Sequence, residues 1–170
     1  MPFTLQQLAF GVVAVMVLGG AIAVVTLRNI FHSLLFLAFS FLGVAGVYLL
    51  LSADFLAAVQ VLIYIGAIIV LMMFALMLTH RVMTTNVTQT VGQWWLALPV
   101  AVGILAILFR VFVQYPWVAQ PGPPQPTTGI IGRELLTKYV LPFELASIVL
   151  LVAMIGAIVL AKEDKPDDPA

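Results

Sequence analysis

The third hydrophobic segment carries the residues whose types and spacing are best suited to chemistry. Gln60 and Tyr64 lie four residues apart, so they share one face of an α-helix, and Gly66 follows directly. Polar side chains within a membrane mark hydrogen-bonded contacts or paths for protons and ions. The glycine allows close helix approach or a local irregularity such as a π-bulge. These residues therefore form either a polar coupling element or a set of packing contacts with neighbouring helices.

Two carboxylates lie near the ends of hydrophobic segments. Asp54 follows a short turn and is predicted to be the N-cap of the third helix. Pro142 suits the first position of the last helix, which puts Glu144 in the first turn, where the helix dipole stabilises a carboxylate. We interpret both as interfacial residues, with a place in a polar pathway as the alternative.

The sequence does not indicate a catalytic, metal-binding or cofactor-binding site in this chain. The two histidines, His32 and His80, lie near different segment ends and would have to face one another to hold a metal or haem. The absence of cysteine excludes disulfides, thiolate metal sites and cysteine nucleophiles. The seven basic and seven acidic residues form no basic stripe, so nucleic acid is not an expected partner.

The composition requires a lipid environment. Hydrophobic residues make up 64% of the 170 residues and charged residues only 8%, whereas soluble domains have about 25% charged residues. A membrane helix needs about 20 consecutive apolar residues. Such runs cover residues 5–27, 30–51, 55–78, 94–113 and 141–160. We predict an all-α integral membrane protein with five transmembrane helices within residues 1–161, followed by a charged, disordered tail at 162–170.

The connections suggest a topology. Arg28 and Asn29 separate the first two segments, so these form an antiparallel hairpin. Residues 114–128 are proline-rich and form an extended loop, and residues 130–139 are predicted to be a short interfacial helix. The positive-inside rule favours a cytoplasmic C-terminus by four basic residues to three. The two sets are Arg28, Arg81, Lys162 and Lys165 against Arg110, Arg133 and Lys138.

The segment from Asp54 to Leu78, with its Tyr64-Ile-Gly66-Ala element and the apolar run that follows, resembles a known helix. It is similar to the third helix of subunit J of the proton-pumping NADH:quinone oxidoreductase, respiratory complex I. The mitochondrial counterpart is NADH dehydrogenase subunit 6. The last segment, which begins Pro142-Phe-Glu144, and the Leu27-Arg28-Asn29 turn are also similar to that family. The resemblance covers nearly the whole chain except the loops and the tail.

The resemblance implies a subunit of the membrane arm in a bacterial inner membrane, packed against subunits A, H and K and the lipid bilayer. Quinone, FMN and the iron–sulfur clusters belong to partner subunits, and this chain holds none of them. In the family the third helix can carry a π-bulge, and its rotation accompanies opening and closing of a water path toward carboxylates of subunit K. Carried over, this places Tyr64 and Gly66, with Gln60 beside them, at a moving coupling element.

Three alternatives stay open from the sequence. Multisubunit cation/proton antiporters contain segments related to subunit J, so the chain could belong to one of them. A related complex could use ferredoxin or another electron donor, because the donor binds elsewhere. The chain could also be a purely structural subunit that fills and seals the membrane arm.

Overall fold

The computed structural model describes residues 4–79, 94–115 and 127–162, and all regular structure in these ranges is helical. Five helices are long and apolar enough to cross a membrane, which confirms the predicted all-α fold with five spans. They are Leu5–Thr26, Ile30–Leu50, Asp54–Leu78, Trp95–Gln114 and Val140–Ala161. Each end lies within one residue of the predicted segment, because the bilayer sets the length of a spanning apolar run. His80, Arg81, Lys165 and the predicted tail from residue 163 on lie outside the described residues.

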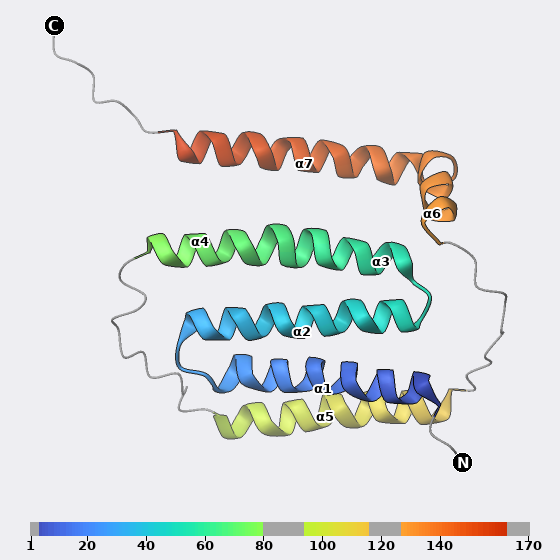
Figure 1. Cartoon of the computed structure of the whole chain (residues 1–170). Coiled ribbons are helices and arrows are strands. Elements are labelled where there is room, and N and C mark those ends of the chain that lie inside the picture. Colours follow the sequence, from blue (N-terminus) through green and yellow to red (C-terminus); the bar gives the residue numbers. More distant parts are fainter. Residues whose placement is uncertain (1–3, 80–93, 116–126, 163–170) are drawn as a thin grey trace, which may run out of the picture.

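Helices α1 (Leu5–Thr26) and α2 (Ile30–Leu50) form the expected antiparallel hairpin (Figure 1). The turn between them is fixed by Asn29, whose Oδ1 accepts hydrogen bonds from the backbone N–H groups of Phe31 at 3.0 Å and His32 at 3.4 Å. This is an N-cap that satisfies two otherwise unpaired amides at the start of α2. The polar pair at 28–29 therefore starts the second helix as well as ending the first.

Small residues bring α1 and α2 into close contact. A Cβ added to Gly20 would lie 2.8 Å from the Cβ of Ser40, and one added to Gly43 would lie 2.8 Å from Cγ2 of Val17. The hydroxyl of Ser40 donates a hydrogen bond of 3.1 Å to the carbonyl oxygen of Val17 across the same interface. Such contacts hold membrane helices together because lipid supplies no hydrophobic driving force between them.

The third membrane helix (Asp54–Leu78) runs back along α2 and has three parts: α3 (Asp54–Val59), the π-helix η1 (Gln60–Ile69) and α4 (Val70–Leu78). It contacts α2 along all three parts. The turn from α2 passes through Ser52, which has a positive φ of 57°. The backbone N–H of Ala53 donates a 2.9 Å hydrogen bond to the carbonyl oxygen of Tyr48 and closes this turn.

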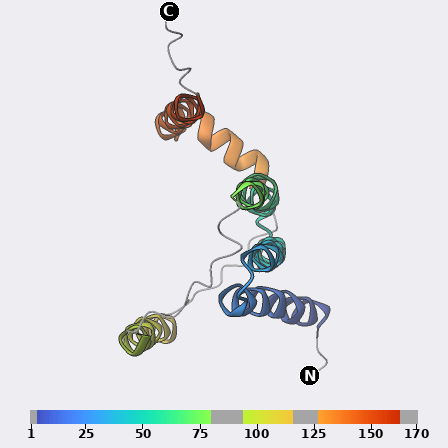
Figure 2. The same ribbon diagram turned by 90° about the vertical axis from the view of Figure 1, so that its left-hand side faces the viewer.

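The second half of the chain packs much less within the chain. The predicted interfacial helix is α6 (Thr127–Leu136), which begins and ends three residues earlier than expected and crosses from α3 to α7 (Val140–Ala161) (Figure 1). Within the described ranges, α7 contacts only α6, and α5 (Trp94–Gln114) contacts no other helix. Figure 2 shows α5 apart from α1, although the two overlap in Figure 1. Both helices thus present mostly apolar side chains outward.

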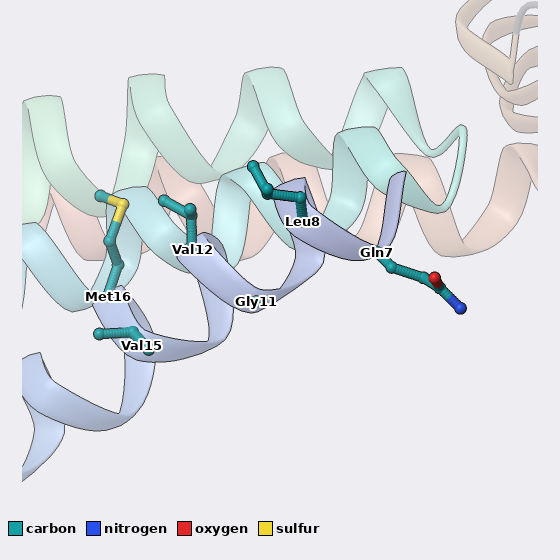
Figure 3. A pocket seen from close by; sticks show the side chains of 6 residues that line it. All are labelled: Gln7, Leu8, Gly11, Val12, Val15 and Met16. Carbon is teal, nitrogen blue, oxygen red and sulfur yellow. The ribbon is translucent and has the colours of Figure 1, made fainter. Parts of the chain in front are cut away.

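The outward face of α1 is concave and almost wholly apolar (Figure 3). The depression is lined by Gln7, Leu8, Gly11, Val12, Val15 and Met16, all from α1 itself. Gln7 uses its Oε1 to accept a 3.1 Å hydrogen bond from the backbone N–H of Thr4, at the start of the helix. The depression therefore offers a packing surface and no group for chemistry.

Candidate functional site

The π-helix η1 is the most unusual backbone feature of the described structure. It extends over ten residues, Gln60–Ile69, although a glycine in this segment suggested only a single bulge. A π-helix joins each residue to the one five positions earlier, and it is rare except as short insertions at functional sites. Gln60, Tyr64 and Gly66 all lie within η1, so the three predicted coupling residues belong to one irregular element.

Gln60 begins η1 and is 6% exposed. Its side-chain amide makes no hydrogen bond to any residue in the described part of the chain, and none joins it to Tyr64. The two side chains also differ in exposure, since Tyr64 is 44% exposed. The two polar residues of η1 thus differ in exposure and are not joined to one another by a hydrogen bond.

Tyr64 is held by an aromatic contact with α2. Its ring meets that of Phe41 edge to face, with the centroids 5.7 Å apart and the planes at 88°. This geometry favours aromatic pairs by about 0.5–1.5 kcal/mol beyond the area they bury. Among the described residues no group forms a hydrogen bond with the Tyr64 hydroxyl. The ring is therefore positioned by the chain, while the hydroxyl is available to water or to a neighbouring subunit.

Gly66 lies where the π-helix leaves little room for a side chain. A Cβ added to it would lie 3.3 Å from the carbonyl oxygen of Val61, the residue five positions earlier. A β-branched side chain would crowd this turn further, because its second γ atom restricts the rotamer against the preceding turn. No other atom outside the local backbone lies within 4 Å of that Cβ, so a substitution here acts mainly on the helix itself.

Asp54 does not cap the third membrane helix, and that prediction was wrong. The N-cap is Ala53, and Asp54 is the first helical residue, with an exposed side chain. An N-cap needs non-helical backbone angles, and Ala53 has φ −98° and ψ 60°. Alanine has no side-chain oxygen. Instead, the hydroxyl oxygen of Thr127 in α6 accepts a hydrogen bond from the backbone N–H of Phe55, with 3.4 Å between Oγ1 and N.

Glu144 lies beyond the first turn of its helix, which also corrects the prediction. Helix α7 begins at Val140 with Tyr139 as N-cap, so Pro142 is its third residue and Glu144 its fifth. The early start follows from the turn after α6, where the backbone N–H of Tyr139 donates a 2.8 Å hydrogen bond to the carbonyl oxygen of Glu134. Proline is tolerated at that third position because the first four helical N–H groups have no partner within the helix.

The structure gathers some of the predicted residues and separates others. Gln60, Tyr64 and Gly66 lie together on η1, which packs on α2, whereas α7 with Glu144 does not contact the third membrane helix in the described structure. The roles of Phe41 and Thr127 could not be predicted from the sequence, because an aromatic residue in an apolar run and a threonine after a proline-rich loop give no local signal. In the described ranges no group of three or more metal-ligating side chains is gathered.

Comparison with known proteins gives consistent matches. Residues 20–160 match the family described as NADH-ubiquinone/plastoquinone oxidoreductase chain 6. The chain is 42% identical to NAD(P)H-quinone oxidoreductase chain 6 of Synechocystis sp., over 94% of this chain and 82% of that protein. It is 46% identical to the organellar chromatophore subunit 6 of Paulinella chromatophora, over 95% and 80% of the two chains. The chloroplastic subunit 6 of Marchantia polymorpha is 42% identical, over 86% and 83%.

Proposed function

Since this chain belongs to the NADH-ubiquinone/plastoquinone oxidoreductase chain 6 family and is a membrane subunit of complex I, we propose that its third membrane helix couples quinone reduction to proton translocation. The observation that carries the proposal is the ten-residue π-helix η1, with polar Gln60 and Tyr64, inside a membrane-spanning helix. The relatives reported above are named as quinone oxidoreductase subunits, which favours this function over a cation/proton antiporter. Quinone, FMN and iron–sulfur clusters would then belong to partner subunits, and this chain would hold no redox group.

The proposed motion is a switch between π and α geometry in η1. Returning a π turn to α geometry shifts the register by one residue, which rotates one end of the helix relative to the other by about 100°. Ile69 is 2% exposed and its neighbour Ile68 is 45% exposed. A shift of one residue would carry Ile68 to the buried position of Ile69, and Ile69 to the position of Val70, which is 43% exposed. A bulky side chain would thus leave one side of the helix while another enters it. Such an exchange can open or close a narrow water path.

Tyr64 would supply the polar group beside that path. A phenol can donate and accept a hydrogen bond, so it can join a chain of waters from both sides. The contact with Phe41, whose ring centroid lies 5.7 Å from that of Tyr64, holds the ring in place, while the hydroxyl stays free to bond. Gln60, whose amide makes no hydrogen bond among the described residues, would offer that amide to the same chain of waters.

The exposed faces of α5 and α7 support the proposed setting. Both helices are mostly apolar and pack little within this chain, so we propose that subunits A, H and K supply their protein neighbours and lipid covers the rest. We also propose a bacterial inner membrane with the C-terminus on the cytoplasmic face. Among the described residues, Arg28 and Lys162 would lie on that side, and Arg110, Arg133 and Lys138 on the other.

The test replaces Gly66 with Val and Tyr64 with Phe in the assembled complex. Proton pumping and quinone reduction are measured together, with NADH, NADPH and reduced ferredoxin supplied separately as donors. Gly66→Val should lock out the π turn and Tyr64→Phe should break the hydrogen-bonded chain, so both should lower the protons moved per electron while quinone reduction continues. Normal coupling in both variants would refute the proposal.

Matched controls come from the same chain. Gly19→Val replaces a glycine in α1 whose added Cβ would meet nothing within 4 Å. Tyr48→Phe removes a hydroxyl from α2, outside η1. Both controls should keep the normal ratio of protons to electrons. A purely structural subunit would instead show altered assembly in the Gly66 and Tyr64 variants, with a normal ratio in whatever complex assembles.

A further inference from the structure

The third membrane helix begins without a cap of its own. The second amide of a helix is normally bonded by the side-chain oxygen of the N-cap residue, but the N-cap here is Ala53. The N–H of Phe55, which is that second amide, donates to the Oγ1 atom of Thr127 at 3.4 Å, 72 positions along the chain. Thr127, from a helix distant in the sequence, thus caps the start of the third membrane helix, where the local sequence offers no capping side chain.

This hydrogen bond has a particular place in the fold. Thr127 is the first residue of α6, and α6 is the only described helix that α7 contacts. Among the described residues, the bond from Phe55 to Thr127 is the only hydrogen bond that joins α6 and α7 to the first three membrane helices. Helices α3 and α6 are also in contact with one another. The start of the third membrane helix is therefore restrained from outside the hairpin that precedes it.

The turn that precedes α3 has an unusual backbone conformation. Ser52 has a φ of 57°, in the left-handed region that non-glycine residues rarely adopt. Backbone hydrogen bonds also close this turn, from the N–H of Ala53 to the carbonyl oxygen of Tyr48 at 2.9 Å and from the N–H of Ser52 to that of Leu49 at 3.0 Å. At the opposite end, α4 makes only slight contact with α2 and ends at Leu78. The helix is thus held at α3 and loosely packed at α4.

We propose that Thr127 is a positioning residue for the coupling helix, whose hydroxyl holds the start of α3 so that a register change in η1 rotates α4. This inference rests on the proposed function. If the start of α3 were free, the rotation would be shared between the two ends and less of it would reach α4. Holding one end directs the whole change to the segment beyond Ile69.

The test uses three variants of the assembled complex. Thr127→Val removes the hydroxyl and keeps the shape, Thr127→Ser keeps a hydroxyl, and Thr128→Val alters the neighbouring exposed threonine. Hydrogen–deuterium exchange of residues 54–59 and the ratio of protons to electrons are measured in each. In Thr127→Val the backbone amides of these residues should exchange roughly fivefold faster, as expected for loss of a typical cap, and the complex should pump fewer protons per electron. Thr127→Ser and Thr128→Val should resemble the unaltered complex in both measurements.

Each contrary result is distinct. Equal exchange in Thr127→Val and Thr128→Val would show that the hydroxyl caps nothing and would overturn the inference. Faster exchange in Thr127→Val with a normal ratio of protons to electrons would overturn the positioning role, and the proposed function would still stand if Gly66→Val uncouples the complex. Normal coupling in Gly66→Val and Tyr64→Phe would refute the proposed function itself, whatever the exchange at α3 shows.

Discussion

The contact between Gly20 and Ser40 allows a sharp prediction about the α1–α2 hairpin. In Gly20→Ala the new Cβ would lie 2.8 Å from the Cβ of Ser40 and 3.0 Å from its backbone. Carbon atoms in ordinary contact are about 3.5–4.0 Å apart, so the two helices must separate by about 1 Å. The hydrogen bond from the Ser40 hydroxyl to the carbonyl oxygen of Val17, now 3.1 Å, would lengthen to about 4 Å and be lost.

The expected destabilisation follows from these two effects. Overpacking of a close interface costs about 1–3 kcal/mol, and a lost interhelical hydrogen bond in a membrane about 0.6 kcal/mol. Gly19→Ala is the matched control, because its added Cβ would meet nothing within 4 Å. Any gain from the better helix propensity of alanine, about 1 kcal/mol in water, applies to both variants, so their difference isolates the packing at Gly20.

The assay compares the two variants in the assembled complex. Native gels report how much of the subunit is incorporated, and the temperature at which half of the quinone reductase activity is lost reports stability. Gly20→Ala should assemble less and inactivate at a lower temperature than Gly19→Ala. Equal assembly and equal inactivation temperatures would show that the small residues do not set the α1–α2 distance.

Three further predictions address the topology and the site. The chain has no cysteine, so each introduced cysteine can be labelled alone with an impermeant thiol reagent. Lys162→Cys should react from the cytoplasmic side and Lys138→Cys from the opposite side. The reverse pattern would show that the topology is inverted. Phe41→Leu removes the edge-to-face contact with Tyr64. It should therefore destabilise the complex by about 1 kcal/mol and lower the ratio of protons to electrons. Phe39→Leu, at an exposed position of α2, should change neither the stability nor the ratio. Glu144→Gln should keep normal coupling, since α7 does not contact the described coupling helix; loss of pumping would place this carboxylate in the pathway.

The membrane helices were predictable because the bilayer imposes one simple requirement. A span needs about 20 apolar residues, and the ends at Thr26 and Ile30 follow from the only strongly polar pair in that region. The N-cap of the third membrane helix was not predictable. Whether it is Ala53 or Asp54 depends on the backbone angles of Ala53. The same applies to Glu144, where a turn after α6 starts the helix before the proline.

The candidate site was only partly predictable. The polar residues Gln60 and Tyr64 beside Gly66 identified the right helix, because polar groups and glycine are informative in an apolar segment. The length of the π-helix was not predictable, since π and α geometry differ in which carbonyl each amide selects and the same apolar residues serve both. The cap from Thr127 and the contact from Phe41 depend on tertiary packing, which local sequence does not specify.

Rotation of the third membrane helix is the central claim, and thiol labelling of Ile68→Cys and Ile69→Cys measures it most directly. Each cysteine would be the only one in this chain, and labelling by a membrane-permeant, water-requiring maleimide is compared between resting and working complex. Position 69 is 2% exposed and position 68 is 45% exposed in the described state. We expect labelling at 69 to rise and labelling at 68 to fall during quinone reduction. Identical labelling at both positions in the two states would contradict the π-to-α switch.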